Sequence, residues 1–171
     1  AEDFVAVIEI PKGSKIKYEL DKETGLMKLD RILHTSTHYP ANYGLIPRTF
    51  ADDDDPLDVL VLCSEALGPM TLVRCYPIGV IRMIDNGRHD DKIIAIPFDD
   101  PNYNTYHSID ELPAHIFAEM THFFRVYKEL ENKVIENRRN LRTTTDLNEK
   151  RRIIAENHEM MAEMNSRWNR I

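Results

Sequence analysis

The sequence predicts a fold of the α+β class, mainly β, in which short strands form a small closed barrel flanked by helices. Three observations support this prediction. The first hundred residues alternate short apolar runs with turn residues, which is typical of consecutive short strands. Apolar side chains beyond residue 113 recur at three- and four-residue spacing, which is typical of helices. The length of 171 residues suits one domain, which we expect to span 1–171.

The N-terminal part contains six segments with the pattern of strands. The polar sequence DKETG over 21–25 predicts a turn that joins the segments 15–20 and 26–33 into a hairpin. The segment 58–63 is apolar almost throughout, as expected for a strand buried on both faces. In the segment 71–84, Pro77 and Gly79 favour a bulge at the middle, and the polar run 85–91 that follows predicts a turn. The predicted strands are 4–10, 15–20, 26–33, 58–63, 71–84 and 92–97.

Two helices are predicted after the last strand. Ser108 with Glu111 has the spacing of a capping box, and Pro113 suits a first helical position. Asp146 with Glu149 predicts the start of a second helix over 147–168. The apolar stripes expected to be buried are Ile116, Phe117, Met120, Phe123, Phe124, Tyr127 and Leu130 in the first helix, and Ile154, Met161, Met164 and Trp168 in the second.

The charge and the cysteines exclude several classes of protein. A formal net charge of −7 argues against general nucleic-acid binding, which requires clustered basic side chains. No apolar stretch approaches the roughly 20 residues that span a bilayer, so no membrane partner is expected. Cys63 and Cys75 have no metal-site spacing and are expected to be buried in the core. We expect a cytoplasmic protein, with an organellar location after processing left open.

An acidic cluster gives the strongest functional signal. Residues 52–58 read DDDDPLD, so five Asp side chains stand together beside a predicted buried strand. Such closely spaced like charges repel each other unless they are solvated, protonated or neutralised by cations, and hard divalent cations prefer oxygen ligands. The spacing does not fit an EF-hand, because Leu57 or Pro56 falls where that loop requires a ligand oxygen. A metal site and a merely solvated acidic loop both remain open on the cluster alone.

Other charged and hydroxyl side chains in the same frame favour a site for a polyanion. Carboxylates can hold Mg²⁺, while Mg²⁺ and basic side chains together hold phosphate oxygens. Asp53, Asp55 and Asp58 can converge across the turn at Pro56. The accompanying groups are the acids Glu9, Glu19, Asp85, Asp90 and Asp91, the bases Lys17, Arg31, Lys92 and Lys128, and the hydroxyls of Tyr39, Tyr43 and Tyr127.

At these residues the sequence resembles the family I soluble inorganic pyrophosphatases. The family signature D-x-D-P-x-D followed by an apolar residue is present at 53–59 as DDDPLDV. Six further blocks occur in the family's order over about residues 4–135. They are VIEIP (7–11), KYEL (17–20), LDR (29–31), HYPANYG (38–44), IDNGRHDDK (84–92) and HFFRVYK (122–128).

The resemblance implies a five-stranded, OB-like barrel and Mg²⁺-dependent hydrolysis of pyrophosphate to two phosphates. The attacking water would be activated by metal, with several Mg²⁺ per site, Mn²⁺ as a possible substitute, and no covalent intermediate. A homo-oligomer is implied, with a hexamer favoured over a smaller assembly. The resemblance implies that Asp55 is the general base, and that the metal ligands are Asp53, Asp58, Asp85, Asp90 and Glu9. It implies that the phosphates are bound by Lys17, Arg31, Tyr43, Lys92, Tyr127 and Lys128. Glu19 and Tyr39 would contact and support these ligands without binding metal or phosphate themselves.

The sequence departs from the family in two places. Asn86 stands where many bacterial members carry Glu, and the helical segment 136–171 lacks the family's usual Trp-containing sequence. Two alternatives are kept: a non-catalytic binding module on an OB-like barrel, and a divalent-metal hydrolase of nucleotides or phosphoesters. The first predicts base-stacking aromatic residues on one strand face, and the second predicts greater activity on ATP than on pyrophosphate.

Overall fold

The computed structural model describes residues 2–33, 36–52, 54–85 and 87–168. Beyond Tyr127 it describes side chains at 136, 139–156, 158–159 and 162. The chain groups into two compact units. The first comprises residues 1–32 and 38–121, and the second comprises 33–37 and 122–171.

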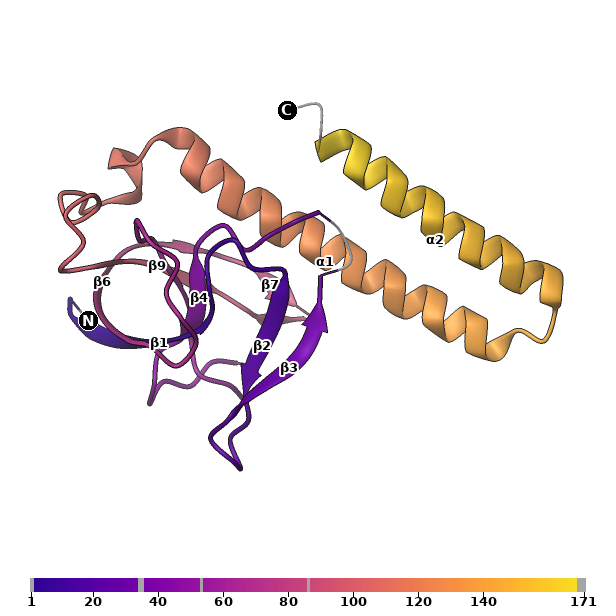
Figure 1. Ribbon diagram of the computed structural model, residues 1–171, viewed down its shortest axis with the longest axis horizontal. Helices are drawn as coiled ribbons and strands as arrows, with labels where there is room; N and C mark the ends of the chain where they lie inside the picture. The colour runs from indigo at the N-terminus through magenta and orange to yellow at the C-terminus, as the bar shows by residue number, and fades with distance from the viewer. Residues whose placement is uncertain (1, 34–35, 53, 86, 169–171) are drawn as a thin grey trace. The chain divides into compact units, whose positions relative to one another are not determined.

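A closed five-stranded barrel forms the centre of the first unit (Figure 1). The barrel closes because β1 pairs with both β4 and β6. Of its five strand pairs, the β5–β9 pair is parallel and the other four are antiparallel. The predicted barrel class is therefore confirmed, and the predicted bulge appears in β6 between Pro77 and Gly79. In order around the barrel, the strands are β1 (Phe4–Ile10), β4 (Asn42–Leu45), β5 (Asp58–Val61), β9 (Lys92–Pro97) and β6 (Leu72–Ile81).

Two antiparallel hairpins accompany the barrel. The predicted hairpin around residues 21–25 is confirmed as β2 (Ile16–Leu20) and β3 (Met27–Ile32), joined by a turn in which Gly25 has a φ of 71°. A smaller hairpin, β7 (Ile84–Asp85) with β8 (Arg88–His89), lies where a plain polar turn was predicted. Two-residue strands give no detectable sequence period, so the pattern did not reveal them.

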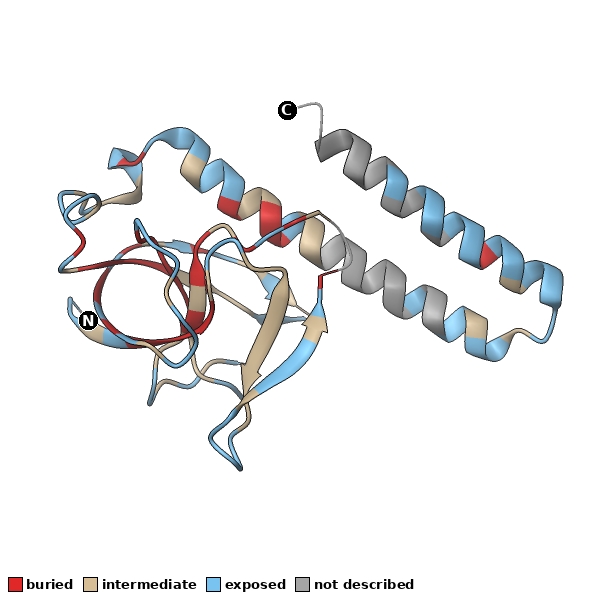
Figure 2. Cartoon of the chain, viewed as in Figure 1, coloured by how far each residue is buried: buried red, intermediate tan, exposed pale blue. Residues whose placement is uncertain are grey.

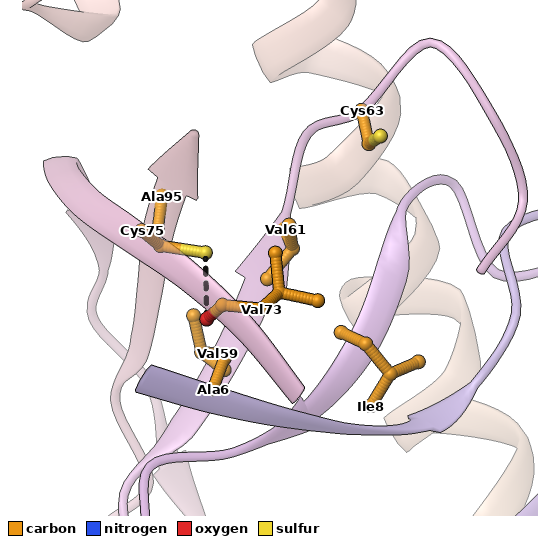
Figure 3. Close-up of a cluster of buried hydrophobic side chains, with 8 residues drawn as sticks. All are labelled: Ala6, Ile8, Val59, Val61, Cys63, Val73, Cys75 and Ala95. Carbon is orange, nitrogen blue, oxygen red and sulfur yellow. Dashed lines mark hydrogen bonds between the residues drawn. The ribbon is translucent and has the colours of Figure 1, made fainter. Parts of the chain in front are cut away.

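The barrel interior is filled by small and branched side chains (Figure 3). The buried residues of this unit concentrate on the barrel strands (Figure 2). Both cysteines are buried as predicted, and burial raises the pKa of Cys75 to about 12, which keeps it an unreactive thiol. The core cluster consists of Ala6, Ile8, Val59, Val61, Cys63, Val73, Cys75 and Ala95.

Strand β4 was missed because its sequence, NYGL, has no alternation and contains residues that are rare in strands. Its position depends on Gly44. A Cβ atom there would lie 1.9 Å from the carbonyl oxygen of Val7, so only glycine permits β4 to approach β1 this closely. The close approach of two backbones, which the local pattern does not encode, therefore creates this strand.

The first helix differs from prediction at its start. Ser108 caps a separate 3₁₀ helix, η1 (Ile109–Glu111), and α1 (Ala114–Thr143) begins one residue after Pro113, the predicted first helical position. Helix α2 (Leu147–Trp168) has the predicted bounds, with the Asp146 carboxylate accepting the N–H of Asn148 at 2.8 Å. The chain reverses direction between the two helices (Figure 1).

Parts of the predicted apolar stripes are wrong. Met120, Phe123 and Phe124 are buried, whereas Phe117 is 38% exposed. In α2, Ile154 is 46% exposed and its neighbour Ile153 is buried instead. Among the described residues, no helix is long and apolar enough to cross a membrane. The side chains of Leu130, Met161, Met164 and Trp168 lie outside the described residues.

Candidate active site

A buried lysine joins two acidic residues at one end of the parallel strand pair. Asp58 begins β5 and Lys92 begins β9, and the two residues are paired in register. The ammonium group of Lys92 forms ion pairs with the carboxylates of Asp58 and Asp90. Burial alone would lower the pKa of Lys92, but these two carboxylates outweigh it and the pKa lies above its ordinary value. The lysine is therefore charged, and the two carboxylates share one cation.

Tyr43 approaches the same cluster from β4. Its hydroxyl donates a hydrogen bond to Asp58. Burial raises the pKa of Tyr43 well above its ordinary value, and the negative charge of Asp58 acts in the same direction, so the phenol keeps its proton and remains a donor. The ring of Tyr39, which is buried, lies 5.4 Å from that of Tyr43 between centroids and is tilted against it. Tyr39 therefore packs beside Tyr43, and its supporting role stays a prediction.

Glu9 connects the barrel to the β2–β3 hairpin. It is a buried acid on β1, and its carboxylate accepts the backbone N–H of Leu20 at 2.8 Å. Burial raises the pKa of Glu9, and the nearby charges of Asp58 and Glu19 act in the same direction. The carboxylate thus sits in a region that is already acidic, where a cation would be favoured.

The hairpin itself carries a cluster of paired charges. Lys17 on β2 and Arg31 on β3 occupy paired positions across the hairpin. Both contact the carboxylate of Asp30, at 3.4 Å and 3.3 Å, and Lys17 also pairs with Glu19 at 2.8 Å. Two basic groups predicted to hold phosphate are thereby placed side by side by the strand register and by their shared contact with Asp30.

The acidic loop, which precedes β5 and includes Asp52, Asp54 and Asp55, carries two further ion pairs. Asp55, predicted as the general base, pairs with Lys22 from the turn between β2 and β3. Asp54 has a left-handed backbone with φ of 71° and pairs with Arg88 of β8 at 3.2 Å. The loop is closed by the N–H of Ala51 donating to the carbonyl of Asp55 at 2.8 Å. The carboxylates of Asp54 and Asp55 therefore each form an ion pair with a basic side chain from another part of the first unit.

Some predicted site residues cannot be assigned to this cluster. Asp85 lies on β7, opposite Arg88. Tyr127 belongs to the second unit, where it is half-buried and its ring stacks 5.8 Å from that of Phe123. Asp53, Asn86 and the side chain of Lys128 lie outside the described residues.

The donor set suits a hard divalent cation. Asp58 and Asp90 already converge on one positive centre, and their oxygens are ligands that Mg²⁺ prefers. Among the described residues, no group of three or more His, Cys, Asp or Glu side chains is close enough to hold a metal ion. Asp53, another predicted metal ligand, lies outside the described residues, and two of the five predicted metal ligands, Asp58 and Asp90, contact the same ammonium group.

Sequence reasoning missed three charged residues of this region: Lys22, Asp30 and Arg88. Asp30 stands inside the LDR block, directly before the predicted phosphate ligand Arg31, so the block itself contained the signal. Lys22 lies in a turn and Arg88 on the two-residue strand β8, where charged residues are ordinary, and only the fold brings them to the acidic loop. The Lys92 contacts show that a residue predicted to bind phosphate is engaged by two predicted metal ligands.

Comparison with known proteins identifies the relatives of this chain. The family model described as "Inorganic pyrophosphatase" matches residues 6–162. A soluble inorganic pyrophosphatase 2 of Chlamydomonas reinhardtii is 54% identical over 136 residues, covering 79% of this chain and 71% of the relative. A soluble inorganic pyrophosphatase 4 of Arabidopsis thaliana is 55% identical, covering 77% and 61%.

Solved structures agree. An inorganic pyrophosphatase of Helicobacter pylori superposes with a TM-score of 0.73 at 44% identity, covering 76% of this chain and 78% of that one. One from Thermus thermophilus gives 0.74 at 41% identity, covering 77% and 76%. The curated relatives are longer, since this chain spans between 61% and 71% of their lengths.

Proposed function

The chain belongs to the inorganic pyrophosphatase family, and we propose that it hydrolyses inorganic pyrophosphate to two phosphate ions. The observation that carries this proposal is the pairing of acids and bases in one unit. Asp58 and Asp90 converge on a cation, and the β2–β3 hairpin offers Lys17 and Arg31. A small polyanion such as pyrophosphate needs both a metal-binding acid set and basic groups for its oxygens.

We propose that Lys17, Arg31 and Tyr43 bind the phosphate oxygens. The two basic groups would neutralise part of the substrate's charge, which otherwise repels an incoming water. Tyr43 keeps its proton, and binding of phosphate would turn this single donor from the Asp58 carboxylate to a phosphate oxygen. Lys92 would donate from its buried position beside Asp58, and Tyr127 and Lys128 are proposed as further phosphate ligands.

Asp55 is proposed to take the proton of the attacking water. Its carboxylate and its partner Lys22 are both exposed to solvent, so a water molecule can reach Asp55. Asp53, Asp58, Asp85, Asp90 and Glu9 are proposed to hold Mg²⁺, which when bound lowers the pKa of a water ligand and screens the charge of pyrophosphate. Mn²⁺ is a possible substitute because it accepts the same oxygen ligands.

The test measures phosphate release from pyrophosphate, ATP and a simple phosphoester, each with Mg²⁺ and with EDTA. We expect release from pyrophosphate that requires Mg²⁺ and exceeds release from ATP. In the variant Asp55→Asn we expect kcat to fall by about 10²–10⁴, the usual contribution of a general base. The exposed Asp99→Asn is the matched control. Full activity of Asp55→Asn would remove its assigned role, and preference for ATP would favour the nucleotide hydrolase.

We further propose that the protein is a homo-oligomer, with a hexamer favoured. The support is membership of a family in which short members assemble in this way. Light scattering coupled to gel filtration gives the mass directly, and a monomer over the working concentration range would refute the proposal.

A further inference from the structure

Arg88 connects the two acidic segments of the site. It lies on β8, paired with Asp85 of β7, and both belong to the β7–β8 hairpin. Its Nη1 atom donates to the carbonyl oxygen of Asp52 at 3.1 Å and to the carboxylate of Asp54 at 3.2 Å. These two residues are the neighbours of Asp53 in the chain, so one guanidinium group holds the acidic loop on both sides of that residue.

The β7–β8 hairpin gains little from apolar packing. Each of its strands has two residues, and Ile84 is 71% exposed, so an apolar core does not position it. An isolated two-stranded hairpin is marginally stable in water. At its base the N–H of Asp90 donates to the carbonyl of Met83 at 3.0 Å, and the N–H of Met83 donates to Asp91 at 3.1 Å. The contacts of Arg88 add a link from this hairpin to the acidic loop.

We propose that Arg88 is a positioning residue that holds the β7–β8 hairpin against the acidic loop and so prepares the carboxylates of both segments for divalent metal. This inference rests on the proposed function, because it takes Asp53, Asp85 and Asp90 as metal ligands. Groups that orient metal ligands raise metal affinity by reducing the ordering that binding must impose.

A second reading of the same contact predicts the opposite effect. If Arg88 were only a positive charge near the acids, removing it would strengthen cation binding, since like charges repel. If it positions the two segments, removing it weakens binding. The sign of the change in affinity therefore separates the two readings.

The experiment measures Mn²⁺ binding by calorimetry, without pyrophosphate, to the full chain and to Arg88→Gln and Arg88→Lys. We expect Arg88→Gln to raise the dissociation constant about three- to tenfold, below the usual range for buried orienting groups because Arg88 is exposed. Arg88→Lys keeps the charge and loses the paired guanidinium donors, so a smaller rise is expected.

Arg74→Gln is the matched control. Arg74 is an equally exposed arginine of the first unit, but it pairs with Asp3, so we expect its removal to leave Mn²⁺ affinity unchanged. If Arg88→Gln binds Mn²⁺ as tightly as the unmodified chain, or more tightly, the inference is overturned. That result does not affect the proposed function, which is tested by pyrophosphate hydrolysis of the unmodified chain. Weaker binding by Arg88→Gln in a chain that does not hydrolyse pyrophosphate would refute the proposed function alone.

Discussion

Asp58 and Lys92 occupy paired positions on the parallel strands β5 and β9, and their side chains form an ion pair in which the lysine is only 4% exposed. The lysine also pairs with Asp90, so it neutralises two acids that would otherwise repel each other. A residue with these contacts contributes to stability as well as to the proposed site.

We expect Lys92→Met to destabilise the fold by about 2–3 kcal/mol, because it leaves two half-buried carboxylates unpaired. Mg²⁺ should restore part of this loss, since a cation that binds the native state stabilises it. Thermal unfolding in EDTA and in millimolar Mg²⁺ measures both effects. Lys12→Met, which removes an exposed lysine, is the control and should behave like the unmodified protein. An equal loss in both buffers would show that metal does not replace the ammonium group.

Glu9→Gln should stabilise the protein and reduce its activity. Burial raises the pKa of Glu9 above its ordinary value of 4.5, so the folded state disfavours the charged form. Stability is therefore lost as pH rises from 4.5 through the raised pKa. The amide avoids this loss and still accepts the N–H of Leu20, so we expect a gain of about 0.5–1 kcal/mol at neutral pH in EDTA.

Urea unfolding of Glu9→Gln at several pH values gives this difference. The gain should vanish below pH 4.5, where both side chains are neutral. A variant that is less stable at neutral pH would contradict the prediction. The Mg²⁺ concentration required for hydrolysis should rise at the same time, because a proposed metal-side carboxylate is lost.

Asp100→Asn should destabilise the loop that follows β5. The buried carboxylate of Asp100 accepts the N–H of Ser64 at 2.7 Å and that of Asn102 at 3.0 Å. Burial would raise the pKa of Asp100, but these hydrogen bonds outweigh it and the pKa lies below its ordinary value of 3.8. The stabilisation is thus present above pH 3.8 and is lost as pH falls through the lowered pKa.

For Asp100→Asn we expect a loss of about 1–3 kcal/mol at neutral pH, because an amide accepts these bonds less strongly and turns its own N–H groups toward one of the donors. Urea unfolding should show the deficit shrinking in acid. Asp99→Asn changes the exposed neighbouring acid and serves as control. A deficit independent of pH would indicate lost packing instead of lost charge.

Gly44→Ala should be severely destabilising. The added methyl group would meet the carbonyl oxygen of Val7 at 1.9 Å and the Cα atom of Ile8 at 2.9 Å, and a backbone between two barrel strands has little room to move. We expect a loss of at least about 3 kcal/mol, with poor yield of folded protein. Gly68→Ala is the matched control, since its nearest neighbour would be the Thr71 hydroxyl at 3.9 Å. Circular dichroism melts of both variants decide the matter.

The parts of this fold that the sequence predicts are those with a period of their own. Strands β1 and β9 and helix α2 have the bounds that their apolar patterns indicate. Strand β4 was missed because the close approach at Gly44 is a property of two strands together. Ile154 was predicted to be buried, whereas Ile153 is buried, because two adjacent isoleucines are equally apolar and the pattern alone does not choose between them.

The site shows a similar division. The types and numbers of its acids follow from the DDDPLDV signature and the resemblance it carries. Which base meets which acid depends on the tertiary fold, because the pairs of Lys22 with Asp55 and of Arg88 with Asp54 each join residues more than 30 positions apart. The roles assigned to all of these residues stay predictions, and Asp53 and the side chain of Lys128 also lie outside the described residues.

The β2–β3 hairpin raises a question of solubility. The barrel strands are each paired on both sides, whereas within the described strands β2 and β3 have one hydrogen-bonded neighbour each and so present open edges. An open edge can recruit a strand from another molecule and start aggregation, and charged side chains are the usual protection. Strand β3 carries Lys28, Asp30 and Arg31. Arg31, proposed to bind substrate, would therefore also help to keep this edge from pairing with other chains, together with Lys28 and Asp30, so neutralising these charges would lower the protein's solubility as well.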